Sequence, residues 1–223
     1  MLVNGARLLW IAWRLAGVLL LALGCQSGFG GEPFVRVQMR SSLEERPPIQ
    51  RVAVAPFAVA SSWQDGVGPD AEDASRLVAR YVAEAMEEQG VDLIPADDVR
   101  RATAAEGSDL APGELARLVA ERLGADALVT GSVSRFQERS GQAGGSVRPA
   151  SVGFEVTLFG APDGEPLWRA LFDETQMPWS ENVLRTSRYP GRGTRWLSAE
   201  ELARWGAGEL ALAIPVGASW RSK

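Results

Sequence analysis

A strictly alternating stretch late in the chain restricts the fold more than any other feature of the sequence. Its apolar side chains stand at every second position: Val152, Phe154, Val156 and Leu158. A period of two is typical of a β-strand that buries one face. Asp163 and Gly164 then supply a turn signal, and a returning strand is predicted from Leu167 to Thr175. The sequence therefore predicts an antiparallel hairpin within a sheet that buries one face.

Strand and helix patterns alternate before this hairpin. Apolar runs predict strands and apolar residues at helical spacing predict helices, over these ranges: strands at 51–57, 91–94 and 127–136, and helices at 70–89, 97–105 and 113–123. A last helix begins with a capping box of Ser198 and Glu201, and Pro215 bounds it. Strands that are separated by helices become parallel neighbours. We therefore expect one α/β domain over residues 51–215, a mixed sheet packed by helices in the order β-α-β-α-β-β-β-α.

The amino terminus has the composition of a secretory signal. Arg7 and Arg14 precede an uncharged apolar run from Leu15 to Gly24, and no acidic residue occurs in this region. The run is too short to span a bilayer, which takes about 20 residues. Cys25 follows at once and is the only cysteine of the chain. The pattern predicts a signal peptide over residues 1–24.

Ala22, Leu23 and Gly24, followed by Cys25, resemble the lipobox of bacterial lipoproteins. The resemblance implies that signal peptidase II recognises these residues and cuts before Cys25. The thiol of Cys25 would then carry a covalent lipid, and no other cofactor is expected. Gln26 stands where an Asp tends to retain lipoproteins in the inner membrane, so the resemblance implies the outer membrane, on its periplasmic face. The other interpretation is an ordinary signal peptide, or a short buried helix, with a chance cysteine.

Two segments flank the expected domain. Residues 25–50 open with glycines and close with Pro47 and Pro48, which predicts a flexible tether between the lipid and the domain. Residues 216–223 are expected to form a carboxy-terminal tail.

The composition excludes several classes of function. Without Arg7 and Arg14, 21 basic residues face 28 acidic ones, a net charge of −7 that disfavours nucleic-acid binding. The chain has no histidine, so it lacks the commonest general base, the commonest metal ligand and a Ser-His-Asp triad. Neither a phosphate-binding loop nor a zinc motif occurs. We therefore assign no catalytic or metal-binding residue and no small-molecule substrate, and we predict that the protein is not an enzyme.

One enzymatic alternative lies in the carboxylates near the end of the predicted hairpin. Asp173, Glu174 and Glu181 are close together in the sequence, and a suitably spaced pair of carboxylates serves glycosidases. The other interpretation is that they are solvated groups at a strand end and in a loop. We favour solvated groups, because strongly perturbed carboxylates are rare outside functional sites.

A long irregular stretch, from 176 to 196, combines cationic and aromatic side chains. It contains our candidates for a partner-binding loop: Arg185, Arg188, Tyr189, Arg192, Arg195 and Trp196. Arginine binds phosphates and carboxylates through its planar fork, and arginine and aromatic residues are enriched at interfaces. The loop would therefore contact lipopolysaccharide, peptidoglycan or an acidic partner. The other interpretation is a solvated loop that balances an acidic domain.

Three stretches, residues 51–57, 91–95 and 123–133, resemble envelope lipoproteins and periplasmic proteins that share the fold of the TolB amino-terminal domain. That group includes the curli secretion lipoprotein and the lipoprotein activators of penicillin-binding proteins. The resemblance implies the TolB-like fold and a non-enzymatic role that binds or assembles envelope proteins, and it transfers no binding residue. The alternative is a subunit of an outer-membrane secretion pore resembling the curli lipoprotein, in which the hairpin at 152–175 would insert into lipid.

Overall fold

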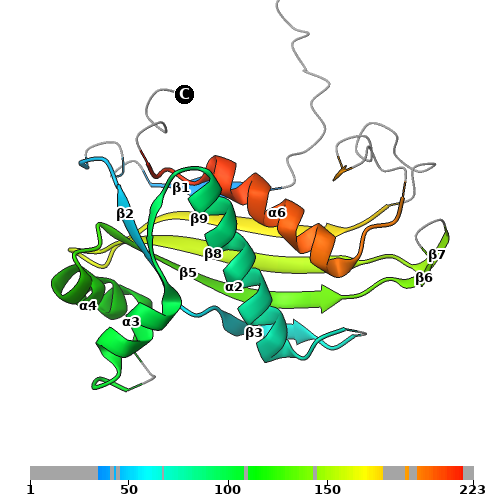
Figure 1. Cartoon of the computed structure of the whole chain (residues 1–223), viewed down its shortest axis with the longest axis horizontal. Coiled ribbons are helices and arrows are strands. Elements are labelled where there is room, and N and C mark those ends of the chain that lie inside the picture. The colour runs from blue at the N-terminus through cyan, green and yellow to red at the C-terminus, as the bar shows by residue number, and fades with distance from the viewer. Residues whose placement is uncertain are drawn as a thin grey trace, which may run out of the picture. The chain divides into compact units, whose positions relative to one another are not determined.

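The computed structural model describes residues 35–40, 43, 46–66, 68–107, 110–142, 145–177, 189–190 and 195–217. These residues form a seven-stranded sheet, a two-stranded sheet and four α-helices (Figure 1). The strands are β1 Val35–Met39, β2 Arg51–Val54, β3 Ala58–Gln64, β4 Asp92–Ile94, β5 Ala127–Gln137, β6 Ser140–Gln142, β7 Gly145–Arg148, β8 Ser151–Gly160 and β9 Pro166–Thr175. The helices are α2 Ala71–Glu88, α3 Ala96–Thr103, α4 Pro112–Leu123 and α6 Ala199–Ala213. None of the helices in the described ranges is both long and apolar enough to cross a bilayer.

The large sheet is mixed, which confirms the expected fold class. Its strands lie in the order β1-β9-β8-β5-β2-β4, and β3 also pairs with β5. β2 runs parallel to β4 and to β5, because α2 and then α3 and α4 connect these strands in sequence. From β5 outward the neighbours are antiparallel, and β8 and β9 form the predicted hairpin, with Ser151 opposite Thr175.

Helices cover the two faces of the sheet unequally. α2 and α6 lie together across one face (Figure 1), where Val129, Val156 and Phe172 are fully buried in the larger core. α3 and α4 cover the opposite face near β2 and the start of β5, with Ala53 and Leu128 in a smaller core. Away from β2 and the start of β5, no helix in the described ranges packs on this second face of the sheet, the face opposite α2 and α6.

Glycine permits two close approaches between elements. The ring of Phe172 lies so near to α6 that a Cβ at Gly206 would come within 2.7 Å of it. At the hairpin turn, Gly164 has a φ of +72°, a conformation that glycine adopts without strain. The same turn rests on the start of α4, where a Cβ at Gly113 would lie 2.6 Å from the Gly164 carbonyl oxygen.

The folded part begins earlier than predicted. Within the expected tether of residues 25–50, Val35–Met39 form β1, which pairs with β9 at the edge of the sheet, and Leu43 and Ile49 are buried. The tether prediction is therefore wrong for these residues, because β1 extends the sheet and Val35, Leu43 and Ile49 join the larger core. At the other end, Val216 is also buried, and the Gly217 amide donates a hydrogen bond to the Ile49 carbonyl, 2.8 Å away.

Candidate functional site

Most of the sites that were predicted from sequence lie outside the described residues. These are Cys25 and the lipobox residues Ala22, Leu23 and Gly24, together with Arg185, Arg188 and Arg192 of the arginine-rich stretch. Tyr189 is described and is buried, with 2% of its surface exposed. Its hydroxyl donates a hydrogen bond to the buried carboxylate of Glu174, and its ring packs edge-on against Trp205. Tyr189 therefore belongs to the core and offers no exposed contact to a partner.

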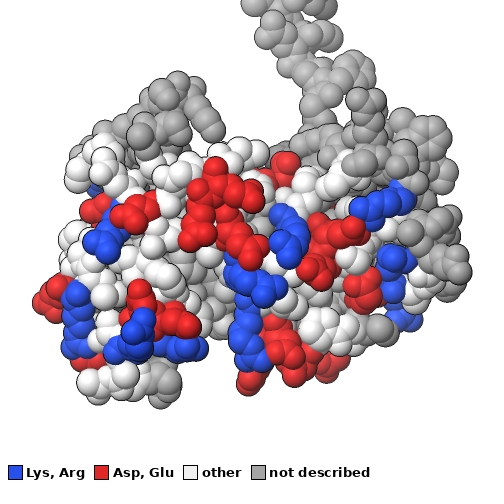
Figure 2. Space-filling model, viewed as in Figure 1, with Lys and Arg blue, Asp and Glu red and all other residues white. Residues whose placement is uncertain are grey.

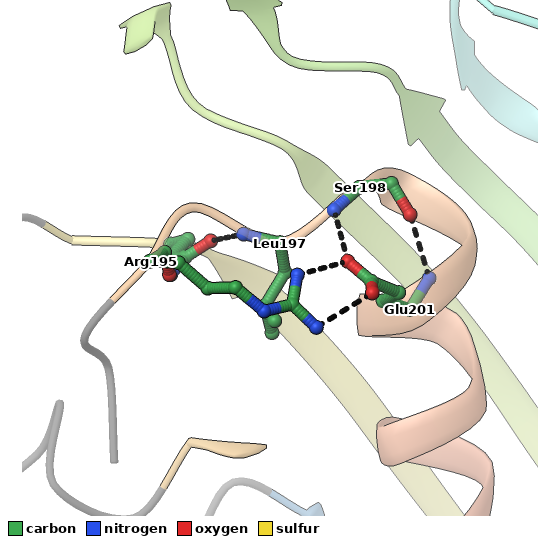
Figure 3. Close-up of polar contacts among 5 residues, drawn as sticks. Arg195, Leu197, Ser198 and Glu201 are labelled. Atoms are coloured by element: carbon green, nitrogen blue, oxygen red, sulfur yellow. Dashed lines mark hydrogen bonds and ion pairs between the residues drawn. The ribbon is translucent and has the colours of Figure 1, made fainter. Parts of the chain in front are cut away.

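Arg195 contributes to the structure at the start of α6 (Figure 3). Its guanidinium donates two hydrogen bonds of 2.7 Å to the Glu201 carboxylate. The same carboxylate accepts from the Ser198 amide at 2.9 Å, and the Glu201 amide donates to the Ser198 hydroxyl at 3.1 Å, which confirms the predicted capping box. The bonds from Arg195, together with that from the Ser198 backbone, lower the pKa of Glu201 from 4.5 to about 2.

The carboxylates proposed for a hydrolase do not form a pair. Asp173 and Glu174 are adjacent in β9 and therefore point to opposite faces of the sheet. Asp173 forms an ion pair with Arg135, whereas Glu174 is buried beside Tyr189. Glu181 lies outside the described residues. In the described part of the chain, there is also no group of three or more residues arranged to hold a metal ion.

A groove of about 1020 Å³ lies on the second face of the sheet. We call it the α3–sheet groove, because strands form its floor and α3, with α4, forms its wall. The floor is supplied by three strands: Thr130, Gly131 and Ser132 of β5, Glu155, Thr157 and Phe159 of β8, and Arg169 of β9. The wall is supplied by α3, α4 and adjoining segments: Ala55, Pro56, Ala58, Val99, Arg100, Arg101, Thr103, Ala104, Gly107, Leu110, Pro112 and Leu115.

Strand register brings the polar floor residues together. Thr130 lies opposite Thr157, and Thr157 lies opposite Arg169, so three adjacent strands each place one polar side chain in a row. Ser132 lies opposite Glu155 in the neighbouring row. The Arg169 guanidinium is 3.4 Å from the Glu155 carboxylate. The floor is thus a patch of hydroxyl groups beside one ion pair.

The hydroxyl groups of the floor are available to an occupant. Thr157 is only 6% exposed, yet it lines the groove, as do the half-buried Thr130 and Ser132. Their side chains form no hydrogen bond to any residue that the structure describes. Buried polar groups are normally hydrogen-bonded, so these hydroxyls need water or an occupant as partner.

The wall is largely apolar, and its charges are balanced. Arg100 and Arg101 reach the rim, and each is ion-paired within α3, with Asp97 and Asp98 respectively. Acidic and basic side chains are likewise interleaved on the face that carries α2 and α6 (Figure 2). The groove therefore has no strong excess of one sign of charge. Sequence reasoning missed it, although the polar residues between the apolar positions of the hairpin were a usable signal.

No family model matches the chain, and no curated protein matches it. Solved structures do resemble it. The PelC dodecamer from Paraburkholderia phytofirmans is 16% identical, with 82% of this chain and 99% of that chain covered and a TM-score of 0.48. Lipoprotein GNA1162 from Neisseria meningitidis is 18% identical, with 56% and 80% covered and a TM-score of 0.39. The LpoB carboxy-terminal domain from Escherichia coli is 16% identical, with 58% and 84% covered and a TM-score of 0.37. At such identities no function transfers from these proteins to this chain.

Proposed function

We propose that this protein is a lipid-anchored module of the cell envelope that binds another protein and catalyses no reaction. The α3–sheet groove is the observation that carries the proposal, because it is large, open and lined by groups suited to binding. The lipobox before Cys25 supports attachment to a membrane, and Gln26 favours the periplasmic face of the outer membrane.

The chemistry of the groove favours binding over catalysis. Its lining contains one carboxylate, Glu155, which is ion-paired with Arg169. The chain has no histidine to act as a base near neutral pH, and its one thiol, at Cys25, would be acylated. Glycosidases need two carboxylates on one site, and Asp173 and Glu174 face opposite sides of the sheet. The groove therefore offers no histidine or thiol to activate its hydroxyl groups, and its one carboxylate is ion-paired.

The dimensions and polarity of the groove suit a protein segment. Its volume of about 1020 Å³ is at the upper end of small-molecule pockets, which range from about 300 to 1,000 Å³. One side is apolar, with Leu115 and Val99, and the other carries hydroxyls such as Thr157. An amphipathic segment matches both sides at once, burying apolar side chains against the helices and placing polar ones on the strands. The balanced charge gives no preference for a strongly acidic or basic partner.

The secretion-pore alternative gains no support from the hairpin. β8 pairs with β5 on one side and β9 on the other, and β9 pairs with β8 and β1. Both strands also contribute fully buried side chains, such as Phe154 and Phe172, to the larger core. Insertion into lipid would have to break the centre of the sheet.

The anchor is tested by expressing the full chain, with its own leader, in a Gram-negative host beside Cys25→Ser. We expect a mature wild-type chain that begins at an acylated Cys25 and sediments with the outer membrane. We expect the Cys25→Ser protein to be absent from that fraction. Intact mass and membrane fractionation are the measurements. An unacylated, soluble wild-type product would refute the anchor.

Partner binding is tested with a photo-crosslinking amino acid at exposed Ala104, which lines the groove, and at exposed Glu121 on α4 as the control. We expect a discrete crosslinked protein from position 104 and none from position 121. Ser132→Trp, which fills the groove, should reduce the crosslink about tenfold or more, the loss that removal of about 1.4 kcal/mol of binding produces. Val59→Trp, on the exposed surface of β3, should leave it unchanged. Crosslinks that survive Ser132→Trp in a protein with unchanged melting temperature would place the binding surface elsewhere.

A further inference from the structure

The distance along the chain between the lipidated residue and the folded part is short. β1 begins at Val35, ten residues after Cys25. Ten residues span at most about 35 Å when fully extended. The unit from Pro33 to Lys223 has the length of a globular domain whose radius of gyration is about 16 Å, so its diameter is about 40 Å. The start of β1 is therefore held within about 35 Å of the membrane to which Cys25 is attached, less than the diameter of the domain.

That part of the surface exposes apolar side chains. Val37 is 45% exposed and Met39 is 52% exposed, and both are large hydrophobic residues. They lie opposite Ala170 and Trp168 of β9, on the sheet face that α6 covers further in, where Val35 is buried. β1 is an edge strand, and its outer edge has no strand partner within the described ranges. Exposed apolar residues at an edge are normally avoided unless something covers them.

Basic groups accompany these apolar residues. Arg36 is exposed in β1, and the side chain of Arg40 directly after it is 63% exposed, 3.7 Å from Glu165. Alternation along β1 places Arg36 on the opposite face of the sheet from Val37 and Met39, so these cations lie at the same edge but not on the apolar face.

We infer that the open edge of β1 faces the lipid surface, with Val37 and Met39 in the headgroup layer. The inference rests on the proposed lipid anchor at Cys25. The α3–sheet groove stays open in this orientation. Its floor residue Arg169 lies opposite Gln38, which points to the other face of the sheet from Val37 and Met39.

Single spin labels test the inference on the full lipidated chain. Because Cys25 is acylated, a cysteine introduced by Val37→Cys or Met39→Cys is the one free thiol. Val59→Cys is the matched control, an exposed apolar residue on β3, which is four strand spacings, about 19 Å, from β1. The proteins are placed in vesicles of phosphatidylethanolamine and phosphatidylglycerol. Relaxation by oxygen, which partitions into lipid, is compared with relaxation by a water-soluble nickel chelate.

We expect the ratio of oxygen to chelate accessibility to be about threefold or more higher at positions 37 and 39 than at 59, as for side chains in the interfacial layer. Equal ratios in a chain of acylated mass would overturn the β1 inference and leave the anchor intact. Spin–spin broadening at position 39 that dilution with unlabelled protein removes, together with a low ratio, would assign β1 to a second copy and also overturn it. A mass without lipid on Cys25 would overturn the anchor and this inference together.

Discussion

Glu201 connects three local features through one side chain. Its carboxylate caps the first turn of α6 through the Ser198 amide, and it receives both guanidinium nitrogens of Arg195. The residue before Ser198 is also fixed, since the Leu197 amide donates to the Gln176 side chain at 2.7 Å. The ionised form of Glu201 is therefore the form that the folded protein stabilises, and its pKa falls from 4.5 to about 2.

Glu201→Gln should reduce stability at neutral pH and make it less sensitive to acid. A lowered pKa means that the contribution of Glu201 is complete above about pH 4.5 and is lost as the pH falls through about 2. We expect the variant to melt at a lower temperature near pH 7, and its melting temperature to fall less than that of wild type between about pH 5 and pH 2. Circular dichroism melts across this range measure both effects.

Glu209→Gln is the control for this prediction, because it removes a charge from the same helix and no ion pair of Glu209 is found among the described residues. Its acid profile should follow wild type. Parallel profiles for Glu201→Gln and wild type would contradict the role assigned to the carboxylate.

Single residues also show where sequence reasoning reaches its limit. The capping box is visible in the sequence because Ser198 and Glu201 are three positions apart and interact locally. Tyr189 and Arg195 looked like surface groups because they lie in a stretch without periodicity. Their contacts show that they are structural. Tyr189 donates a hydrogen bond to Glu174, fifteen residues earlier, and this contact depends on the path of the chain in space.

Among the elements, α6 packs on the sheet through an unusually close contact. Gly206 faces Phe172, whose ring lies between Phe154, at a centroid distance of 5.1 Å, and Trp205, at 5.9 Å. The ring is fully buried, and protein cores are packed with few voids. A larger side chain at position 206 must therefore push the helix away from the sheet.

Gly206→Ala should destabilise the protein by about 1–2 kcal/mol, because overpacking outweighs the better helix propensity of alanine. Gly208→Ala, in the same helix, places its Cβ in open space and should stabilise by about 0.5–1 kcal/mol. Urea unfolding of the two variants measures the difference. A destabilisation of equal size in both variants would show that the Phe172 contact is not the cause.

The sequence predicted long periodic elements and also the short buried strands β2 and β4, whose apolar runs stand between turn signals. The hairpin, α2, α4 and α6 carry many apolar residues in register, and the structure confirms them. β1 and β3 were missed for a physical reason. In both strands most side chains are exposed, so neither has the clear two-residue alternation of β8. β1 exists because β9 offers a free edge, and that information lies about 130 residues away in the sequence.

On the scale of the whole molecule, the fold separates two surfaces. The α3–sheet groove lies on the sheet face that helices leave partly open, and the exposed apolar side chains of β1, Val37 and Met39, lie toward the other face. The sequence indicated an anchored α/β domain, because the leader and the strand–helix order are local patterns. It could not indicate the groove, whose lining combines β5, β8, β9, α3 and α4.

If the proposed leader directs export, the pairing of β1 with β9 also sets an order of events during that export. Val35 lies opposite Phe172, and the Gly217 amide bonds to the Ile49 carbonyl, so the first and last parts of the domain close on each other. A chain that crosses the inner membrane amino terminus first delivers position 25 long before β9 emerges. The sheet cannot close until more than 130 further residues have followed, and such long-range pairing is slow. Lipidation at Cys25, as proposed, would then take place on an open chain and need not compete with folding.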